Sequence, residues 1–171
     1  MRSIDGRDVI RHATEGDLPA IIAIYNASIP GRLATADTEP VSLESRVGWF
    51  REHDPARHPL WVLERDGRIA GWLSLGRFHP RPAYDATVEV SVYVATALHR
   101  HGVGTALLRH AIEASASLSA RTLVALVFGH NAASLGLFEK FGFERWAHLP
   151  EVADLDGQWK DLAILGRRVT R

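Results

Sequence analysis

The sequence predicts a single domain of the mixed α/β class, in which helices flank one twisted sheet. The chain has 171 residues, which is the length of one ordinary domain. Residues 87–94 alternate as a strand does, and a loop with two glycines then leads into a helical pattern at Val103, the order expected of a crossover between parallel strands. We therefore expect one domain over residues 1–171, with the polar residues 1–7 forming a flexible N-terminus.

Helical spacing and turn residues organise the first third of the chain. A short strand is predicted at Val9–Arg11. Thr14, followed three residues later by Asp17, resembles the N-cap of a helix. The apolar positions of that helix are Leu18, Ile21, Ile22 and Tyr25. A second helix is predicted over Leu43–Phe50, with loops that contain proline on both sides of it.

A hairpin and a central strand follow. Trp61–Leu63 and Ile69–Leu75 flank the turn residues Asp66 and Gly67, which predicts two antiparallel strands. The next strand covers Thr87–Val94 and shows the clearest alternation in the chain, with four valines on one face. The opposite face carries Thr87, Glu89, Ser91 and Tyr93.

The remaining third is predicted to contain two helices and three strands. A helix begins at Val103, and its apolar stripe consists of Val103, Leu107, Ala111, Ala114 and Leu118. The β-branched run Arg121–Phe128 is typical of a buried strand, and Asn131–Lys140 of a short helix. Glu144–His148 and Lys160–Leu165 are the last two predicted strands.

Composition and charge exclude several classes of function. The 20 basic residues equal the 20 acidic ones, whereas a nucleic-acid-binding domain carries a surplus of lysine and arginine. The chain has no cysteine, so thiolate metal sites and cysteine nucleophiles are absent. No uncharged run approaches the length of a membrane span, and no export signal is visible. We expect a cytoplasmic protein that binds neither nucleic acid nor membrane.

The histidines do not predict a metal site. His99, His101 and His110 lie close in the sequence, but no carboxylate completes a ligand set on that helix face. We therefore expect no metal.

The loop before the helix at Val103 is predicted to bind an anion. Gly102 and Gly104 follow a strand and open a helix, so backbone amides point outward at the positive end of the helix dipole. A dinucleotide fingerprint would require a third glycine where Leu107 stands, and an ATP-binding loop would require a lysine before Thr105. The predicted ligand is therefore a diphosphate group of a molecule other than a dinucleotide or ATP.

These motifs together resemble the GNAT acetyltransferases. The family loop, Gln/Arg-x-x-Gly-x-Gly/Ala, corresponds to residues 99–104, with the departure that His99 occupies its first position. Asn131 precedes Phe138 by seven residues, and Phe141-Gly142-Phe143 follows, similar to the family's second motif. Within the superfamily the chain is most similar to phosphinothricin and methionine sulfoximine N-acetyltransferases. The stretches that carry this similarity include Thr38-Glu39-Pro40, residues 83–89, Val92-Tyr93-Val94 and residues 157–161.

The resemblance implies a GNAT fold with a splayed central strand pair and acetyl-CoA as co-substrate. It implies transfer of acetyl to the α-amine of a small amino acid or analogue, and assembly as a homodimer. The residues expected to hold the cofactor are Val92, Tyr93, Val94, His101, Gly102, Val103, Gly104, Thr105 and Asn131.

Glu89 is the predicted general base. An alkylammonium is protonated near neutral pH and cannot attack a thioester, so a group at the site must accept its proton. Glu89 lies on the polar face of the central strand, just upstream of the segment expected to pair with the pantetheine arm.

The general acid is left open. The family places a tyrosine or a histidine where this chain has Phe138, which cannot donate a proton. Tyr93, Tyr25, His130 or water could substitute. A thiol has a pKa of about 8.5, so the thiolate could also leave unassisted.

Acceptor-binding residues are expected in two loops and on the central strand. The loop before residue 87 offers Arg81 as a bidentate partner for a carboxylate, with His79 and Tyr84 beside it. Ser91 lies near Glu89 on the strand. Thr38, with Thr35 and Asp37, belongs to a loop that closes over substrate in related enzymes.

Two alternatives remain at this stage. An enzyme of the same fold could acetylate a protein N-terminus or a polyamine. A non-catalytic acyl-CoA-binding module is the second alternative, because Phe138 removes the usual acid.

Overall fold

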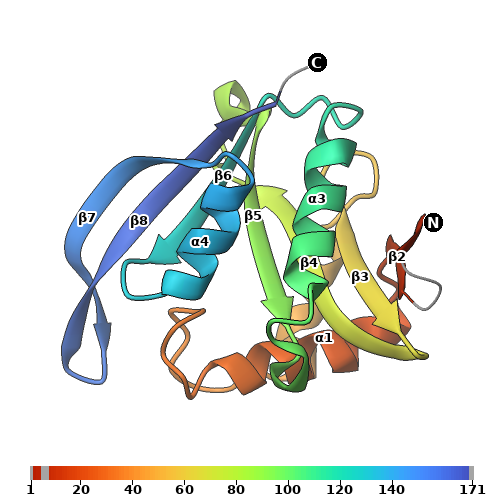
Figure 1. The fold of residues 1–171 in the computed structure, drawn as a ribbon, viewed down its shortest axis with the longest axis horizontal. Coiled ribbons are helices and arrows are strands. Elements are labelled where there is room, and N and C mark those ends of the chain that lie inside the picture. The colour runs from red at the N-terminus through yellow and green to blue at the C-terminus, as the bar shows by residue number, and fades with distance from the viewer. Residues whose placement is uncertain (1, 5–7, 170–171) are drawn as a thin grey trace.

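The computed structural model describes residues 2–4 and 8–169. One eight-stranded sheet with the order β1-β2-β3-β4-β5-β6-β8-β7 runs through it (Figure 1). The strands are β1 (Arg2–Ile4), β2 (Asp8–His12), β3 (Leu60–Arg65), β4 (Arg68–Arg77), β5 (Thr87–Val94), β6 (Thr122–Phe128), β7 (Glu144–Leu155) and β8 (Gln158–Arg168). The helices are α1 (Leu18–Ser28), α2 (Leu43–Arg51), α3 (Val103–Ser115) and α4 (Ala132–Lys140).

The predicted fold class, a mixed sheet with a splayed central pair, is confirmed. Strands β5 and β6 are parallel and pair only from Thr87 to Glu89, where Glu89 faces Val124. Beyond Glu89, β5 pairs only with β4, on its other side, while β6 remains paired with β8, its partner along the whole strand from Thr122 to Phe128. The two central strands therefore separate immediately after Glu89.

Helices cover both faces of the sheet. Helices α3 and α4 lie in front of it in Figure 1, and the side chains that α3 buries join the larger core with residues of β4, β5 and β6. Residues of α1, β3 and β4 form a smaller core on the other face, with Trp72 among them. The valines of β5 pack in the first core and Tyr93 in the second. The predicted alternation of β5 is thus confirmed, since period two sends neighbouring side chains to opposite faces.

The predicted hairpin is also confirmed. Asp66 and Gly67 connect β3 to β4, and both have positive φ angles, 51° and 73°. Two consecutive positive φ angles are those of the tight hairpin turn that this residue pair favours.

The ends of the chain differ from the prediction. Of the N-terminal residues predicted to be flexible, 1 and 5–7 lie outside the described residues, and Arg2–Ile4 pair with β2 as a short strand. The last two strands are longer than predicted because the pairing continues past Pro150 through a bulge. Pro150 lies on the edge strand β7, where a missing amide hydrogen costs no ladder bond. Asp156 and Gly157, both with positive φ, form the turn between β7 and β8. An Asp-Gly pair favours such a turn, and this signal for the longer hairpin was not used in the sequence prediction.

We expect Gly71→Ala to destabilise the protein by about 2 kcal/mol, because overpacking a close contact forces the neighbouring atoms apart. A Cβ at Gly71 would lie 2.8 Å from the carbonyl oxygen of Tyr93 and 2.8 Å from Cγ1 of Val103. Gly76→Ala on the same strand is the control, since a Cβ there meets nothing within 4 Å. Urea unfolding measures both variants. Equal stability of the two would contradict the close approach of α3 to β4.

Candidate active site

Three adjoining cavities lie along the polar face of β5. Their volumes are about 170, 600 and 410 Å³. We refer to them as the aromatic pocket, the cleft and the splay cavity. Ser91 lines all three, and Glu89 lines the cleft and the splay cavity. These two side chains therefore lie where the cavities meet.

The surroundings of Glu89 suit a proton acceptor. Its side chain is half-buried, and it forms no hydrogen bond or ion pair within the described part of the chain. Burial raises the pKa of Glu89 above the ordinary 4.5, since removal from water disfavours the charged form. A raised pKa makes a carboxylate a stronger base.

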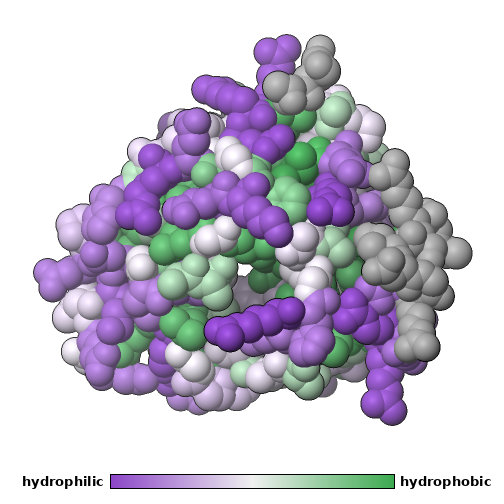
Figure 2. Space-filling view, in the orientation of Figure 1, coloured by the Kyte–Doolittle hydropathy of each residue, from purple (hydrophilic) through white to green (hydrophobic). Residues whose placement is uncertain are grey.

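The splay cavity fills the gap between the diverging strands. Val92 and Tyr93 line it from β5, Val127 and Phe128 from β6, and Asn131 from the start of α4. Figure 2 shows an opening near the centre of the molecule in the region between α4 and β5, with hydrophobic side chains above it and a hydrophilic side chain below it. A slender, partly apolar group can therefore pass between the strands and reach Glu89.

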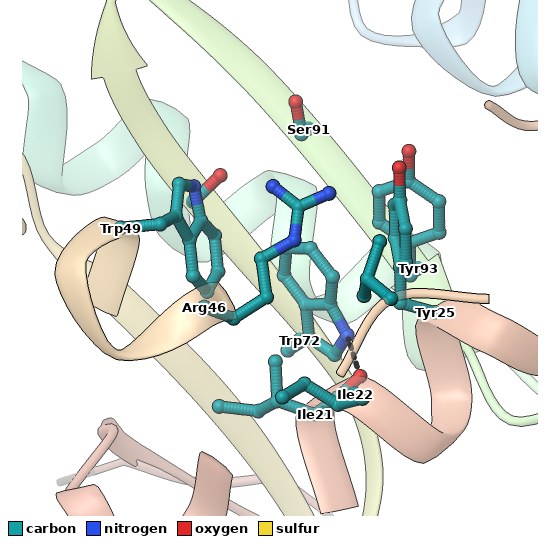
Figure 3. Close-up of a pocket in the computed structure, with 10 residues that line it drawn as sticks. Ile21, Ile22, Tyr25, Arg46, Trp49, Trp72, Ser91 and Tyr93 are labelled. Atoms are coloured by element: carbon teal, nitrogen blue, oxygen red, sulfur yellow. Dashed lines mark hydrogen bonds between the residues drawn. The ribbon is translucent and has the colours of Figure 1, made fainter. Parts of the chain in front are cut away.

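The aromatic pocket lies between α1, α2 and the sheet (Figure 3). Trp72 stacks on Tyr93 with ring centroids 4.6 Å apart, and its Nε1 donates to the carbonyl oxygen of Ile21 at 3.1 Å. The guanidinium of Arg46 enters the pocket and points toward Ser91 in Figure 3. One of its nitrogens donates to a carboxylate oxygen of Asp37 at 2.9 Å, and its other N–H groups form no hydrogen bond within the described residues.

The cleft is the largest of the three cavities and the most polar. Besides Glu89, Ser91 and Ser74, its lining consists of Trp49, Glu52, His53, His58, Gly76 and Arg77. Burial lowers the pKa of His53 and of His58, so both imidazoles are neutral at neutral pH.

The loop between α1 and α2 is fastened over the splay cavity by residues far away in the sequence. The Tyr93 hydroxyl donates to the carbonyl of Ala34 at 3.1 Å. The side-chain Nδ2 of Asn131 donates to the carbonyl oxygen of Leu33 at 3.0 Å. Arg32 forms a bidentate ion pair with Asp156 in the β7–β8 turn, with N···O distances of 2.6 and 3.2 Å. The loop thereby becomes one wall of the cavity.

The start of α3 leaves amide hydrogens free for an anion. Gly102 has a φ of 81° and is the N-cap, a conformation that glycine adopts without strain. No carbonyl in the described residues accepts from the amides of residues 102–105, as expected of a first helical turn. His99 Nε2 lies 3.0 Å from the Val94 carbonyl oxygen, so the unusual first residue of the loop fastens it to the end of β5. These residues fit a diphosphate group.

Some residues predicted to bind the acceptor lie away from the cavities. Arg81 and Tyr84 are exposed, and His79 contacts them rather than the cleft, since its Nδ1 accepts from the Arg81 amide at 3.2 Å. Thr38 is also exposed, and its carbonyl accepts from Arg32 at 2.9 Å. Only Ser91 of this predicted set lines the three cavities.

The candidate proton donors are all engaged in hydrogen bonds. Phe138, which occupies the position of the family's usual proton donor and cannot donate, is buried beside Phe143 and lines the splay cavity. Tyr93 is the tyrosine that lines this cavity, and burial raises its pKa. The Tyr25 hydroxyl bonds to Asp37 and Thr35, and His130 Nε2 lies 2.8 Å from the carbonyl oxygen of Arg32. Neither of the last two lines the splay cavity.

Sequence reasoning missed the contribution of α2. Arg46, Trp49 and His53 are spaced by three and four residues and line the cavities from one side of this helix and its C-terminal end. Polar and aromatic residues at this spacing are a signal for a functional helix face. The apolar positions used in the sequence prediction, Val47 and Phe50, do not separate this side from the rest of the helix, because Phe50 packs with Trp49 against the smaller core.

The described residues contain neither a metal-binding cluster nor a membrane-crossing helix. No group of three or more histidine, cysteine, aspartate or glutamate side chains is placed to hold a metal ion among residues 2–4 and 8–169. No helix within these residues is long and apolar enough to cross a membrane.

Comparison with known proteins gives consistent matches over nearly the whole chain. Residues 19–143 match the model of the acetyltransferase (GNAT) family. A Bacillus subtilis protein, named as a proposed phosphinothricin acetyltransferase, is 47% identical over 162 residues, which cover 94% of this chain and 99% of the relative. The L-methionine sulfoximine/L-methionine sulfone acetyltransferase of Pseudomonas aeruginosa is 35% identical over 91% of each chain. The crystal structure of a phosphinothricin acetyltransferase from Sinorhizobium meliloti in complex with acetyl-CoA superposes with a TM-score of 0.90 at 27% identity, covering 95% of this chain and 89% of that one.

Proposed function

Because this chain belongs to the GNAT acetyltransferase family, we propose that it transfers acetyl from acetyl-CoA to the α-amine of a small amino acid or amino-acid analogue. Membership of the family makes it an acetyl-CoA-dependent N-acetyltransferase. The acceptor class is supported by the names of the relatives, which act on phosphinothricin or on methionine sulfoximine and methionine sulfone.

The observation that carries the proposal is the position of Glu89. It lies at the junction of the splay cavity, through which a slender thioester arm can arrive, and the cleft, which can hold a small molecule. A base at this junction can reach an amine that lies in the cleft, and that amine faces a thioester that lies in the splay cavity. Proximity of this kind is a large part of catalysis by acyl transfer enzymes.

The residues of this chain would hold the cofactor at two places. The amides of residues 102–105 suit its diphosphate, and the β5 segment beyond Glu89 leaves its edge open for backbone pairing with the pantetheine arm. Bound there, acetyl-CoA supplies the activated acetyl group.

Glu89 performs the proton chemistry of the proposal. Its carboxylate accepts a proton from the ammonium of the acceptor, which frees the nitrogen lone pair for attack. Phe138 has no proton to give to the leaving sulfur. The hydroxyl group of Tyr93 donates its hydrogen to the carbonyl oxygen of Ala34. We infer that the thiolate leaves unassisted or through water, which a thiol pKa of about 8.5 permits at low cost.

Arg46 is the proposed partner of the acceptor's carboxylate. It projects a partly neutralised guanidinium into the aromatic pocket next to Ser91, and Ser91 is the neighbour of Glu89 on the same strand face. An α-amino acid carries its carboxylate and amine on one carbon, so both groups can be held at once.

A thiol-release screen tests the proposed function. Acetyl-CoA is the donor, and the acceptors are L-phosphinothricin, L-methionine sulfoximine, the common amino acids, peptides with a free N-terminus and polyamines. We expect saturable turnover with amino acids or their analogues. Saturable activity on peptides or polyamines alone would replace the acceptor class, and acetyl-CoA binding without turnover on any amine would favour the non-catalytic module.

We expect Arg46→Gln to raise KM for amino-acid acceptors by about 10- to 100-fold, since a charge-assisted hydrogen bond is worth about 1.5–3 kcal/mol. The KM for the corresponding amine without its carboxylate should change little. Arg81→Gln, at the exposed arginine predicted from sequence, is the matched control and should leave both values unchanged. An equal rise for the two acceptors would assign Arg46 to fastening the α1–α2 loop through Asp37, and an effect of Arg81→Gln would restore the sequence-based hypothesis.

The remaining expectations also stay proposals. We propose a homodimer that acts in the cytoplasm on small molecules, without nucleic acid or membrane as partners. The dimer is supported by two exposed tryptophans at opposite ends of the long hairpin, Trp146 on β7 and Trp159 on β8, because aromatic side chains are enriched at interfaces. Light scattering of the purified protein measures the oligomeric state.

A further inference from the structure

The cleft beside Glu89 contains an imidazole that the proposed chemistry does not use. His53 follows the C-terminal end of α2 and lines the cleft. Its Nδ1 lies 2.9 Å from the carbonyl oxygen of Trp49. A carbonyl oxygen only accepts hydrogen bonds, so Nδ1 carries the hydrogen of the neutral ring.

This contact leaves Nε2 as a hydrogen-bond acceptor. In a neutral imidazole with hydrogen on Nδ1, Nε2 presents a lone pair. No hydrogen bond to His53 Nε2 is formed within the described residues. The ring of Trp49 packs edge-on against the imidazole, with centroids 4.7 Å apart. Both contacts hold the ring in one orientation at the wall of the cleft.

The charges around His53 do not make it an imidazolium. Burial has the largest effect and lowers the pKa of His53. The hydrogen bond to the Trp49 carbonyl raises this pKa, the neighbouring His58 lowers it, and Glu52 raises it. Arg77 and Glu89 are the other charged groups that line the cleft. The ring therefore acts as an acceptor, and not as a cation, near neutral pH.

We propose, on the basis of the proposed function, that His53 is a specificity-determining residue that accepts a hydrogen bond from an N–H or O–H group on the acceptor's side chain. With the amine at Glu89, the side chain of an amino acid extends into the cleft that His53 lines. A donor on that side chain pairs with Nε2. A side chain of the same shape with only acceptor atoms leaves Nε2 unpaired and brings two lone pairs together, which costs binding.

Two nearly isosteric compounds test this preference. L-methionine sulfoximine carries an N–H group where L-methionine sulfone carries an oxygen, so only the first can donate to Nε2. We expect kcat/KM to be about tenfold higher for the sulfoximine, the size of one buried hydrogen bond. The measurement is thiol release with acetyl-CoA at saturation.

Three variants isolate the role of Nε2. In His53→Asn, the side-chain amide can still donate to the Trp49 carbonyl, but no acceptor remains at the Nε2 position, so the preference should fall to near unity. In His53→Gln, the longer side chain can place an oxygen near the Nε2 position, and part of the preference should return. His58→Asn makes the same change at the neighbouring imidazole of the cleft and should keep the wild-type preference.

The outcomes separate this inference from the proposed function. Equal kcat/KM values for the two compounds in the wild type overturn the role of His53 and leave the proposed function standing. A preference that survives in His53→Asn, or that His58→Asn also removes, overturns it as well. Failure of both compounds, with turnover of some other class of amine, overturns the acceptor class and the role of His53 together.

Discussion

Glu89→Gln is expected to lower kcat by about 10²- to 10⁴-fold, the usual contribution of a positioned general base. Glutamine keeps the shape of the side chain but cannot accept the ammonium proton. The affinity for acetyl-CoA, measured by calorimetry, should stay unchanged, because the amides of residues 102–105 and the open edge of β5 remain in place. A variant that keeps its turnover would exclude Glu89 as the base.

The pH dependence of kcat provides the control for this variant. Glu89 must be ionised to act, so kcat rises with pH as its carboxyl group loses its proton. Burial raises the pKa of Glu89, so the midpoint of that rise lies above 4.5, the ordinary value for glutamate. Glu89→Gln should abolish this limb of the profile. A limb that persists in the variant would belong to another group.

Thr105→Glu is expected to weaken acetyl-CoA binding by about 100-fold without destabilising the fold. Thr105 is the third residue of α3, a position where glutamate favours helix formation. The added carboxylate would stand beside the diphosphate that the amides of residues 102–105 are proposed to hold. Two like charges about 5 Å apart repel by about 3 kcal/mol at an effective dielectric of about 20. Calorimetric titration with acetyl-CoA gives the affinity, and urea unfolding gives the stability.

Ser45→Glu is the matched control for this change. Ser45 is the third residue of α2, and its amide donates to the N-cap Ser42 at 3.2 Å. The substitution therefore adds the same charge at the same helix position, away from the splay cavity. We expect unchanged affinity for acetyl-CoA. Equal weakening by both variants would reflect net charge, and unchanged affinity in Thr105→Glu would place the diphosphate elsewhere.

Local patterns were sufficient for the elements that meet at Glu89. Alternation along β5 placed Glu89, Ser91 and Tyr93 on one face, and the structure has them there. The glycines before α3 predicted a helix start with unpaired amides, which the backbone contacts bear out. Each of these features depends on residues within a few positions of one another, so a periodic pattern or a turn motif is enough to predict it.

The acceptor side of the site depended on packing between distant segments. Helix α2 buries none of its residues fully, so its apolar positions, Val47 and Phe50, did not indicate which face would meet the cavities. Arg46 and His53 face the site because α1 and β4 fix how α2 lies on the sheet. Arg81 had the right chemistry but stands on an exposed loop outside the cavities. Residue type alone could not distinguish the two arginines.

The sequence by itself determined the class of fold, the polar face of the central strand and the unpaired amides at the start of α3, because each arises from contacts between near neighbours in the chain. Only the tertiary structure decided which side chains line the three cavities and how the α1–α2 loop is held. That loop is fastened by Asn131, 98 residues beyond its partner Leu33, and by Asp156, 124 residues beyond Arg32. Contacts over such separations form only when the whole sheet has brought its strands together, and no local pattern encodes them.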